Sequence, residues 1–548
     1  MRKFITAGMI FLSFLLVWMV SGCQEKPSTL LTEPDGTITR SGGQQEGSEI
    51  RKSKEFPDRI ITETVQAAEV YRAGNLTIAE GAMVTATGPL TIHCTGKLTL
   101  NGRIRSGGDL VLIVPGGLEC GPEAMVEPGG NFILVSSPEL VPTPEQLEMD
   151  IQQIEHYGPG IGVGKSPFGD SRRNPVMSTP IKAHKVFVFP PPVWLPPIKF
   201  RKDSSGRSIW VYIWGQLNVG NRARKSTTYD LPHGKRGKDK SKCNAIGGRG
   251  GRGGSVILRA TNRIEFYGDV TFNLGSGGLG GNATAVDCCP ARARGGKGGK
   301  PGLFRVEVDF FGLNQAIVVH DNLRFNLGNG GKGGNAYAGA LEGKAGCPGE
   351  NGCNATATGG NGGSVNWQVR YWGNIIGLDK ITIGVNAVGG QGGNAIAFGG
   401  EGGKGKDDNC SSGPCHGGNG GKAIARGGNG GDFVVAVPAP LKRVGNSTGG
   451  NGGNATAYGG DGGDGGWCCR PPFQGGDGGK GGDAEAYPGL PGNGDAIGNA
   501  GNTDGLSGEG GNGGWGAPPP NGRLGQGGNP GNAVNVQQGQ QGLDGQPC

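Results

Sequence analysis

Large apolar side chains are scarce in this chain, and glycine takes their place. Aromatic residues make up 6% of the 548 residues, whereas 118 residues are glycine, against a usual glycine frequency of roughly 7%. This composition excludes a single large core of Leu, Ile and Phe, because glycine buries no side chain and loses the most backbone entropy on ordering. The net charge of +7 is small for this length. We expect no nucleic-acid partner, because no basic face interleaved with aromatic residues is visible.

The familiar signatures of catalysis and metal binding are missing as well. No histidine forms an HxxxH pair or lies in a GxSxG-like setting; the six are His93, His156, His184, His233, His320 and His416. Arg305, Glu307 and Asp309 alternate along one expected strand, and we interpret them as a solvated strand face. The segment 427–435 fits one copy of the calcium nonapeptide GGxGxDxUx, which needs stacked copies to bind. The sequence therefore predicts no enzyme, no cofactor and no metal, with calcium as an alternative.

The first 23 residues resemble a bacterial lipoprotein signal. A short basic start precedes an apolar run over 4–20, and the run ends in Val-Ser-Gly-Cys at Cys23. The run is short for a membrane span; a lone uncleaved anchor helix is the alternative. The resemblance implies a lipidated Cys23, a membrane partner through that lipid and, with Gln24 following, a place in the outer membrane or at the cell surface. We interpret residues 24–64 as a polar tether.

Residues 65–137 carry short runs of alternating apolar and polar residues, broken by glycine. Leu76-Thr77-Ile78 and Leu98-Thr99-Leu100 are examples. A period of two indicates strands, and many short strands with glycine turns favour a parallel β-solenoid in which each coil buries its face on the next.

Residues 138–242 form a Pro-rich, irregular insertion. The segment 142–157 has the best helical pattern of the chain. The Pro-rich stretch 187–199 favours extended structure; we expect it to be rigid and packed on the solenoid, with a Pro-rich docking ligand as the alternative. The segment 208–217 is expected to be a strand.

A longer repeat organises residues 243–488. The phrase GGxGGNAxA recurs, as in 277–285, 330–338, 389–398 and 449–458. Each copy follows one to three short strands and precedes a loop and a second GGxGG tract. We therefore expect further solenoid coils whose glycine tracts are excursions that leave at one fixed corner. In the Gly-rich C-terminal segment 489–548 the triplet register breaks, which favours a capping or looser end.

Glycine triplets have the three-residue period of a polyproline-II helix, which makes no internal hydrogen bonds. Two edges of such a helix are bare backbone, so neighbouring chains can approach closely and supply the missing partners. The third edge, occupied by Asn, Asp, Lys, Glu and Gln, is expected to be solvated. The alternative is a flexible glycine-rich linker. The overall prediction is an all-β protein: a parallel β-solenoid with polyglycine-II excursions cross-linked by disulfides.

Thirteen cysteines are present, and the removal of Cys23 from the count leaves an even number. An exported chain meets an oxidising compartment, so we expect disulfides; the candidates are Cys94, Cys120, Cys243, Cys288, Cys289, Cys347, Cys353, Cys410, Cys415, Cys468, Cys469 and Cys548. Stacked coils would bring Cys94 and Cys120 together. Local closure is expected for two pairs, Cys347–Cys353 and Cys410–Cys415. The adjacent pairs at 288–289 and 468–469 are expected to reach other loops, with Cys243 and Cys548 as candidate partners. Metal binding is the alternative, although zinc prefers tighter spacings.

The GGxGGN phrase over 247–548 resembles the polyglycine-II bundles of phage tail-tip adhesins and of an insect glycine-rich antifreeze protein, and also glycine-rich mycobacterial surface proteins. The resemblance to the adhesins implies that loop tips form the contact surface. We therefore expect a non-enzymatic, lipid-anchored structural or adhesion protein of the bacterial cell envelope. Its expected partners are a surface polysaccharide, a protein receptor or further copies of itself. The alternatives are a β-helical carbohydrate-active enzyme and an ice- or mineral-binding protein.

Overall fold

The computed structural model describes residues 56–164, 190–201, 205–220, 226–308, 315–407, 413–467, 474–513, 515 and 526–546. The segment Glu55–Cys548 forms one compact unit. Several predictions fall outside the described residues: the signal peptide 1–23 with Cys23, residues 24–55 of the tether, Asp309, and the cysteines Cys410, Cys468, Cys469 and Cys548. No helix in the described ranges is long and apolar enough to cross a membrane.

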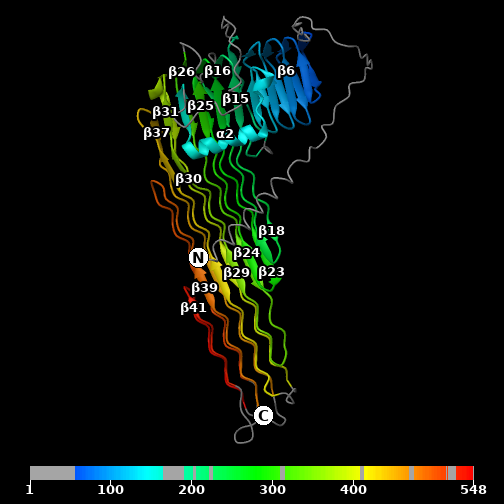
Figure 1. Ribbon diagram of the computed structural model, residues 1–548, viewed down its shortest axis with the longest axis vertical. Helices are drawn as coiled ribbons and strands as arrows, with labels where there is room; N and C mark the ends of the chain where they lie inside the picture. The colour runs from blue at the N-terminus through cyan, green and yellow to red at the C-terminus, as the bar shows by residue number, and fades with distance from the viewer. Residues whose placement is uncertain are drawn as a thin grey trace, which may run out of the picture. The chain divides into compact units, whose positions relative to one another are not determined.

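The chain is nearly all β, and its paired strands are parallel, as in the predicted solenoid (Figure 1). Sheet A contains, in spatial order, β1 (Arg59–Ile61), β4 (Leu76–Ile78), β7 (Leu98–Leu100), β10 (Leu118–Cys120), β14 (Val193–Leu195), β16 (Gln216–Gly220), β21 (Arg263–Tyr267), β26 (Ala316–Val319) and β32 (Ile375–Ile376). Sheet B contains β11 (Met125–Glu127), β8 (Arg103–Ser106), β5 (Met83–Ala86) and β2 (Thr64–Gln66).

Sheet C contains β3 (Val70–Ala73), β6 (Leu90–Cys94), β9 (Leu110–Ile113), β12 (Phe132–Val135), β15 (Ile209–Ile213), β20 (Val256–Ala260), β25 (Phe304–Val308), β13 (Gly160–Val163) and β31 (Arg370–Trp372). Sheet D contains β17 (Ser226–Asp230), β22 (Asp269–Asn273), β27 (Leu323–Asn326), β33 (Ile381–Gly384) and β37 (Lys442–Val444). The strands β30 (Val365–Gln368) and β36 (Phe433–Ala436) form a separate pair, and η3 (Leu378–Lys380) is a short 3-10 turn.

Each solenoid coil visits the sheets in turn, so a residue lies in register with its counterpart one coil away. Leu76, Leu98 and Leu118 pair in this way, and all three are fully buried. Aromatic rings stack between coils in the same manner, with Tyr229 4.8 Å from Phe272. The solenoid begins at β1, inside the range predicted as tether, and the range 138–242 contributes solenoid strands as well as an insertion.

The insertion contains η1 (Pro138–Leu140), α2 (Pro144–Tyr157) and β13. The predicted helix is confirmed: Thr143 caps its start and accepts a hydrogen bond from the Gln146 N–H, which satisfies a backbone donor that the first turn leaves free. After the helix, β13 inserts between β25 and β31. Figure 1 shows α2 lying across the strands of sheet C, next to the point where the excursions leave.

A buried polar network lies under α2. Asp150 of the helix accepts hydrogen bonds from the Tyr212 hydroxyl at 2.5 Å and from Arg259 at 3.1 Å. Arg259 also donates to Glu307 at 3.3 Å, and Arg305 donates to the same carboxylate at 3.0 Å. The predicted solvated face was therefore wrong for Arg305 and Glu307, which are 7% and 0% exposed. The helix covers this face, and burial of charges requires pairing of this kind.

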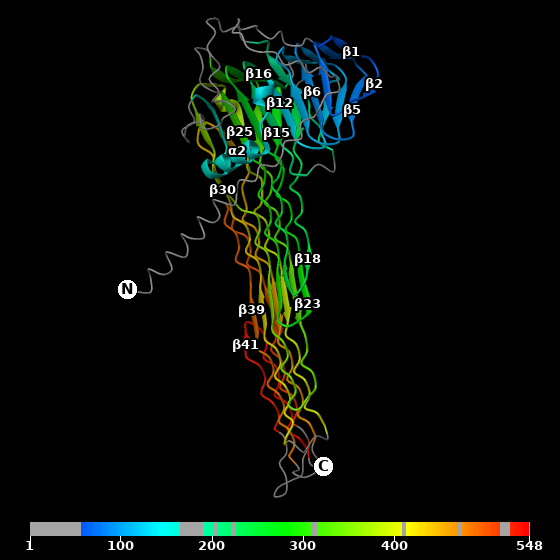
Figure 2. The ribbon, with the colours of Figure 1, turned by 45° about the vertical axis from the view of Figure 1, so that its right-hand side comes forward.

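The excursions form a second structure, a bundle of glycine chains that the reader can follow in Figure 2. They leave after sheet D strands, so the prediction of one fixed corner is confirmed. Midway, the outward legs form sheet E, with β18 (Lys240–Ser241), β23 (Ala283–Cys288), β28 (Ala336–Ala340), β34 (Ala395–Phe398), β38 (Ala455–Tyr458) and β40 (Thr503–Leu506). The return legs form sheet F, with β19 (Asn244–Ile246), β24 (Ala291–Arg294), β29 (Ala355–Thr358), β35 (Ala423–Arg426), β39 (Ala484–Tyr487) and β41 (Ala533–Val534).

The core between sheets E and F consists almost wholly of alanine. Within the AxA phrase both alanines face inward; Ala336, Ala338, Ala395 and Ala397 are at most 2% exposed. A methyl group is the largest side chain that repeats in this core. Each GGxGGNAxA phrase therefore forms one chain of the bundle. Its GGxGG part allows close backbone packing, and its AxA part forms one strand of the alanine-lined sheets.

Candidate contact surface on the glycine bundle

The glycine triplet satisfies all its backbone donors through neighbouring chains. In Gly333-Gly334-Asn335, the Gly333 N–H donates to the Gln391 carbonyl at 2.8 Å, in the next excursion. The Gly334 N–H donates to the Gly296 carbonyl at 2.8 Å, in the opposite layer. Main-chain pairing between the tracts was predicted, and it replaces the internal hydrogen bonds that a polyproline-II helix lacks.

The third donor of the triplet is satisfied by a side chain. The Asn335 N–H donates to Oδ1 of Asn282 at 3.0 Å, and the Asn394 N–H donates to Oδ1 of Asn335 at 3.0 Å. The ladder continues through Asn454 and Asn502 at the same distance. The third edge was predicted to be merely solvated, but its Asn and Asp side chains accept hydrogen bonds from the next excursion. This explains why short amide and carboxylate side chains recur there.

The two glycines of a doublet face opposite directions. A Cβ on the first one, such as Gly280, would lie closer than 3.0 Å to the backbone of the following excursion at Gly334. A Cβ on the second one, Gly281, would clash equally with the preceding excursion at Lys238. Real Cβ atoms essentially never approach so closely, so glycine is required wherever a neighbouring chain exists on that side.

At each of the two outer edges of the bundle, where no further excursion follows, larger residues replace glycine. The first excursion (232–254) has none before it, and its second-glycine positions hold Lys235 and Lys238. At the other edge, the first-glycine positions hold Pro488, Pro491 and Ile497. Side chains and proline block the addition of a further chain, which is how natural sheet edges are protected. The segment from residue 489 onward, for which a capping or looser end was expected, supplies Pro491 and Ile497 of this edge.

Among the described residues, three disulfides join consecutive excursions: Cys243–Cys288, Cys289–Cys353 and Cys347–Cys415. The adjacent pair at 288–289 reaches other loops as predicted, and Cys243 is one partner. The predicted local closures were wrong: Cys347 and Cys353 bond to different excursions, and Cys415 bonds to Cys347 rather than to Cys410. Parallel stacking places equivalent loops side by side, so cross-links between excursions are favoured over links within one loop.

We expect the variant C289A/C353A to lose roughly 2–4 kcal/mol of stability, because the link between the second and third excursions disappears while the other two disulfides remain. Thermal unfolding and limited proteolysis of the full chain test this, with new cleavage expected near residues 289 and 353. Unchanged protease resistance would show that the Cys289–Cys353 disulfide is not needed to hold these two excursions together.

Cys94 and Cys120 are free thiols, so their predicted disulfide was wrong. They lie on different sheets, C and A, and face different parts of the coil. Burial raises the pKa of both thiols to about 12. A thiol with so high a pKa holds almost no thiolate at neutral pH, and thiolate is the reactive form.

We therefore expect neither Cys94 nor Cys120 to react with iodoacetamide at pH 8 in the folded chain, and both to react after unfolding. Mass spectrometry of labelled peptides reads this directly. Rapid labelling of Cys94 in the folded chain would contradict its burial.

The distal end of the bundle exposes two stacked tryptophans. Trp467 and Trp515 have ring centroids 4.6 Å apart with planes at 10°, and they are 48% and 38% exposed. The backbone at Trp467 is fixed by two hydrogen bonds: the backbone N–H of Trp467 donates to Oδ1 of Asp407 at 3.0 Å, and the N–H of Gly466 donates to the Cys415 carbonyl at 2.8 Å. The disulfide to Cys347 thus anchors the chain next to the exposed indole.

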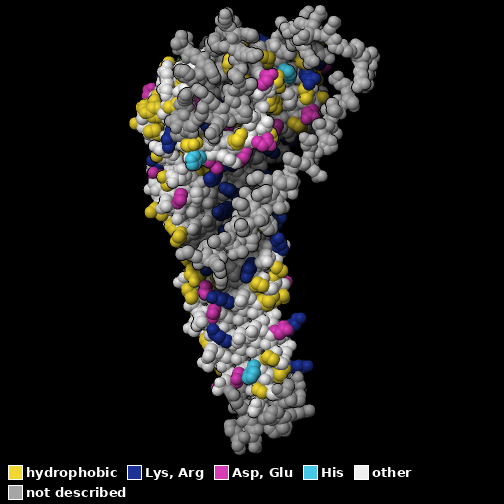
Figure 3. All heavy atoms as spheres, in the orientation of Figure 1, with side chains coloured by type: hydrophobic (Ala, Val, Ile, Leu, Met, Phe, Trp, Pro, Cys, Tyr) yellow, Lys and Arg dark blue, Asp and Glu magenta, His cyan; other side chains and the backbone are white. Residues whose placement is uncertain are grey.

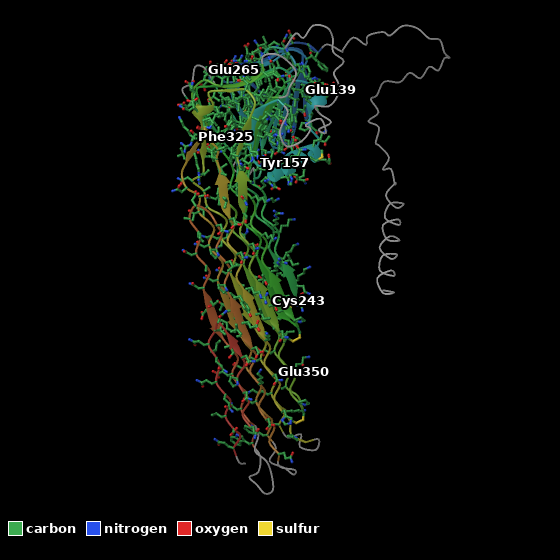
Figure 4. The ribbon with its side chains drawn as sticks, turned by 60° about the vertical axis from the view of Figure 1, so that its left-hand side comes forward. Glu139, Tyr157, Cys243, Glu265, Phe325 and Glu350 are labelled. Atoms are coloured by element: carbon green, nitrogen blue, oxygen red, sulfur yellow. A yellow bond between two sulfur atoms is a disulfide. The ribbon has the colours of Figure 1, made fainter. Side chains whose placement is uncertain are left out.

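A second cluster lies on the outer face of sheet A, far along the chain from the tryptophans. Glu265 accepts a hydrogen bond from the Tyr267 hydroxyl, is hydrogen-bonded to Nε2 of His320 at 2.9 Å and forms an ion pair with Arg263 at 2.8 Å. Although burial opposes ionisation, hydrogen bonds from Tyr267 and His320 and the nearby Arg263 hold the pKa of this carboxyl below its ordinary value. A carboxyl group with several partners and a lowered pKa is better suited to a structural role than to general acid catalysis, which requires a group that carries a proton. Figure 4 shows Glu265 on the solenoid and Cys243 and Glu350 on the bundle.

The calcium nonapeptide at 427–435 lies in the bundle. Its Asp432 accepts a hydrogen bond from the Asn493 N–H at 2.8 Å, as the other side chains of the third edge do. Within the described ranges, no group of three or more His, Cys, Asp and Glu residues could hold a metal ion.

Comparison with known proteins does not assign the chain to a family. No protein-family model matches the chain, and no curated protein matches it. One solved structure is similar: the nine polyproline type II helical bundle springtail antifreeze protein from Granisotoma rainieri, at 26% identity. The match covers 29% of this chain and 90% of that one, with a TM-score of 0.08. At that score we draw no conclusion from it.

Proposed function

We propose that the chain is a non-enzymatic, lipid-anchored protein of the bacterial cell surface, with a structural or adhesive role, in which the distal ends of the excursions form the contact surface. The observation that carries this proposal is the exposed pair Trp467 and Trp515 at the end of a cross-linked bundle. Rigid aromatic anchors are enriched at binding hot spots, and exposed indoles offer a large apolar area with a hydrogen-bond donor.

The bundle supports this role because it is stiff without a large core. Its chains share backbone hydrogen bonds along their length, and three disulfides tie neighbouring excursions together. Ordering of the contact residues before binding lowers the entropic cost of association. The lipid anchor rests on the resemblance of residues 1–23 to a lipoprotein signal.

The test is adhesion of cells that display the full chain to a panel of immobilised surface polysaccharides and glycoproteins. We expect the variant W467A/W515A to reduce adhesion by at least tenfold. The matched control is I497A, which removes an apolar side chain that is 67% exposed at the bundle edge. Equal loss in both variants, or no loss in either, would argue against the tryptophan surface. Cleavage of a polysaccharide that is abolished in E265Q would overturn the non-enzymatic assignment.

A further inference from the structure

Charge is distributed unevenly across the bundle. The first excursion (232–254) carries seven Lys and Arg and one acidic residue, whereas the fifth (449–493) carries five acidic residues and two basic ones. Because the excursions stack in chain order, this is a gradient from one edge of the bundle to the other. The net charge of the whole chain, +7, does not reveal this gradient, because the basic and acidic excursions offset each other.

The cations of the first excursion are spread along both of its legs. Its two legs are bonded to each other, Gly248 N–H to the Lys238 carbonyl at 2.7 Å and Gly251 N–H to the Lys235 carbonyl at 2.6 Å. The next return leg is adjacent, with Gly250 N–H bonded to the Lys297 carbonyl at 2.9 Å. We call the resulting surface the basic edge; it comprises Lys235, Lys238, Lys240, Lys242, Arg249 and Lys297, all exposed. Figure 3 shows Lys and Arg side chains on this side of the bundle, where Figure 1 places β18 and β23.

Neighbouring acids do not neutralise these cations. Arg236 is paired with Asp239 at 3.1 Å, and Lys300 is paired with Glu155 at 3.3 Å, so neither belongs to the basic edge. For its six members, the described part of the chain contains no ion pair. Lysine is also a common means of blocking a sheet edge, but the opposite edge is blocked by proline, Ile497 and glutamine without cations. Moreover, Arg249 and Lys297 occupy third-edge positions, where blocking is not needed.

We propose that the basic edge is a binding surface for a linear acidic polysaccharide. Lys235 and Lys238 lie three residues apart on one leg, about 9.3 Å in a polyproline-II helix, and Lys240 and Lys242 follow on the same leg. The hydrogen-bonded backbone holds these cations in place, so a polyanion meets them with little ordering cost. The first excursion (232–254) contains no Phe, Tyr or Trp, whereas a site for single-stranded nucleic acid would offer aromatic rings on which bases stack. This surface is separate from the tryptophan pair and does not depend on it.

The test measures binding of the full chain to polygalacturonate and to dextran sulfate, with neutral dextran and duplex DNA as comparison probes. We expect one or both acidic polysaccharides to bind, with affinity falling as salt rises. The variant K235Q/K238Q/R249Q is expected to bind at least about tenfold more weakly than the original chain. The variant K332Q/K344Q/K406Q removes the same charge from later excursions and is expected to bind within twofold of the original chain. W467A/W515A is expected to bind normally.

Thermal unfolding of each variant checks that the fold is intact, which is expected because all substituted side chains are exposed. Several results would overturn the proposal: no binding of either acidic polysaccharide, equal binding of neutral dextran, or equal weakening by both triple variants. Tighter binding of DNA would assign the surface to nucleic acid instead. Salt-sensitive self-association as the sole interaction would assign it to the acidic edge of a second copy.

Discussion

Replacement of Gly334 by alanine is expected to destabilise the bundle by about 3–5 kcal/mol, at the upper end for a single substitution. The new Cβ would lie closer than 3.0 Å to the backbone carbonyl of Gly281. The neighbour is main chain on two sides, so no side-chain rotation relieves the clash. Thermal unfolding and amide hydrogen exchange of the full chain measure the effect, with lost protection expected at residues 281, 296 and 334.

The matched control is Gly339→Ala, in the same leg. The nearest atom to its Cβ would be Tyr337 Cε1 at 3.7 Å, an ordinary contact. We expect this variant to unfold within about 0.5 kcal/mol of the original chain. Similar stability of the two variants would show that the chains are not packed closely enough to exclude a methyl group.

The second large effect is expected for Asp150→Ala, at about 3–5 kcal/mol. The substitution removes one of the two carboxylates, Asp150 and Glu307, that pair with the Arg259 guanidinium in the described residues, and it removes the acceptor of the Tyr212 hydroxyl. Arg259 is 3% exposed. The cost of an uncompensated buried charge exceeds the worth of the original pair. Denaturant unfolding monitored by tryptophan fluorescence is a suitable measurement.

Glu119→Ala is the control for this network, because it removes an ion pair to Lys97 that is largely exposed. We expect little change, since solvent screens such pairs. A double variant D150A/R259M tests the cause: if the buried charge is responsible, removal of Arg259 as well recovers part of the lost stability. No recovery would mean that α2 is held mainly by its apolar contacts.

The solenoid and the bundle are stabilised in different ways. The solenoid is stabilised by buried apolar side chains and, under α2, by a paired ionic network. The bundle has little side-chain burial beyond its alanine layer and relies on backbone hydrogen bonds. Damage to a glycine therefore affects a region where no large core can compensate.

Local sequence patterns were enough to predict the solenoid strands, the excursions at one corner and the helix of the insertion, because each depends on a short period: two in strands, three in glycine tracts and 3.6 in α2. The edges of the bundle are also visible in the sequence, because Lys235 and Pro488 occupy positions at which inner excursions have glycine. The cysteine pairing, the burial of Glu307 and the stacking of Trp467 on Trp515 required the three-dimensional structure, because each joins residues far apart in the chain. The number of residues in each excursion sets which cysteines and tryptophans become neighbours, and the α2 insertion, which packs over sheet C, buries Glu307.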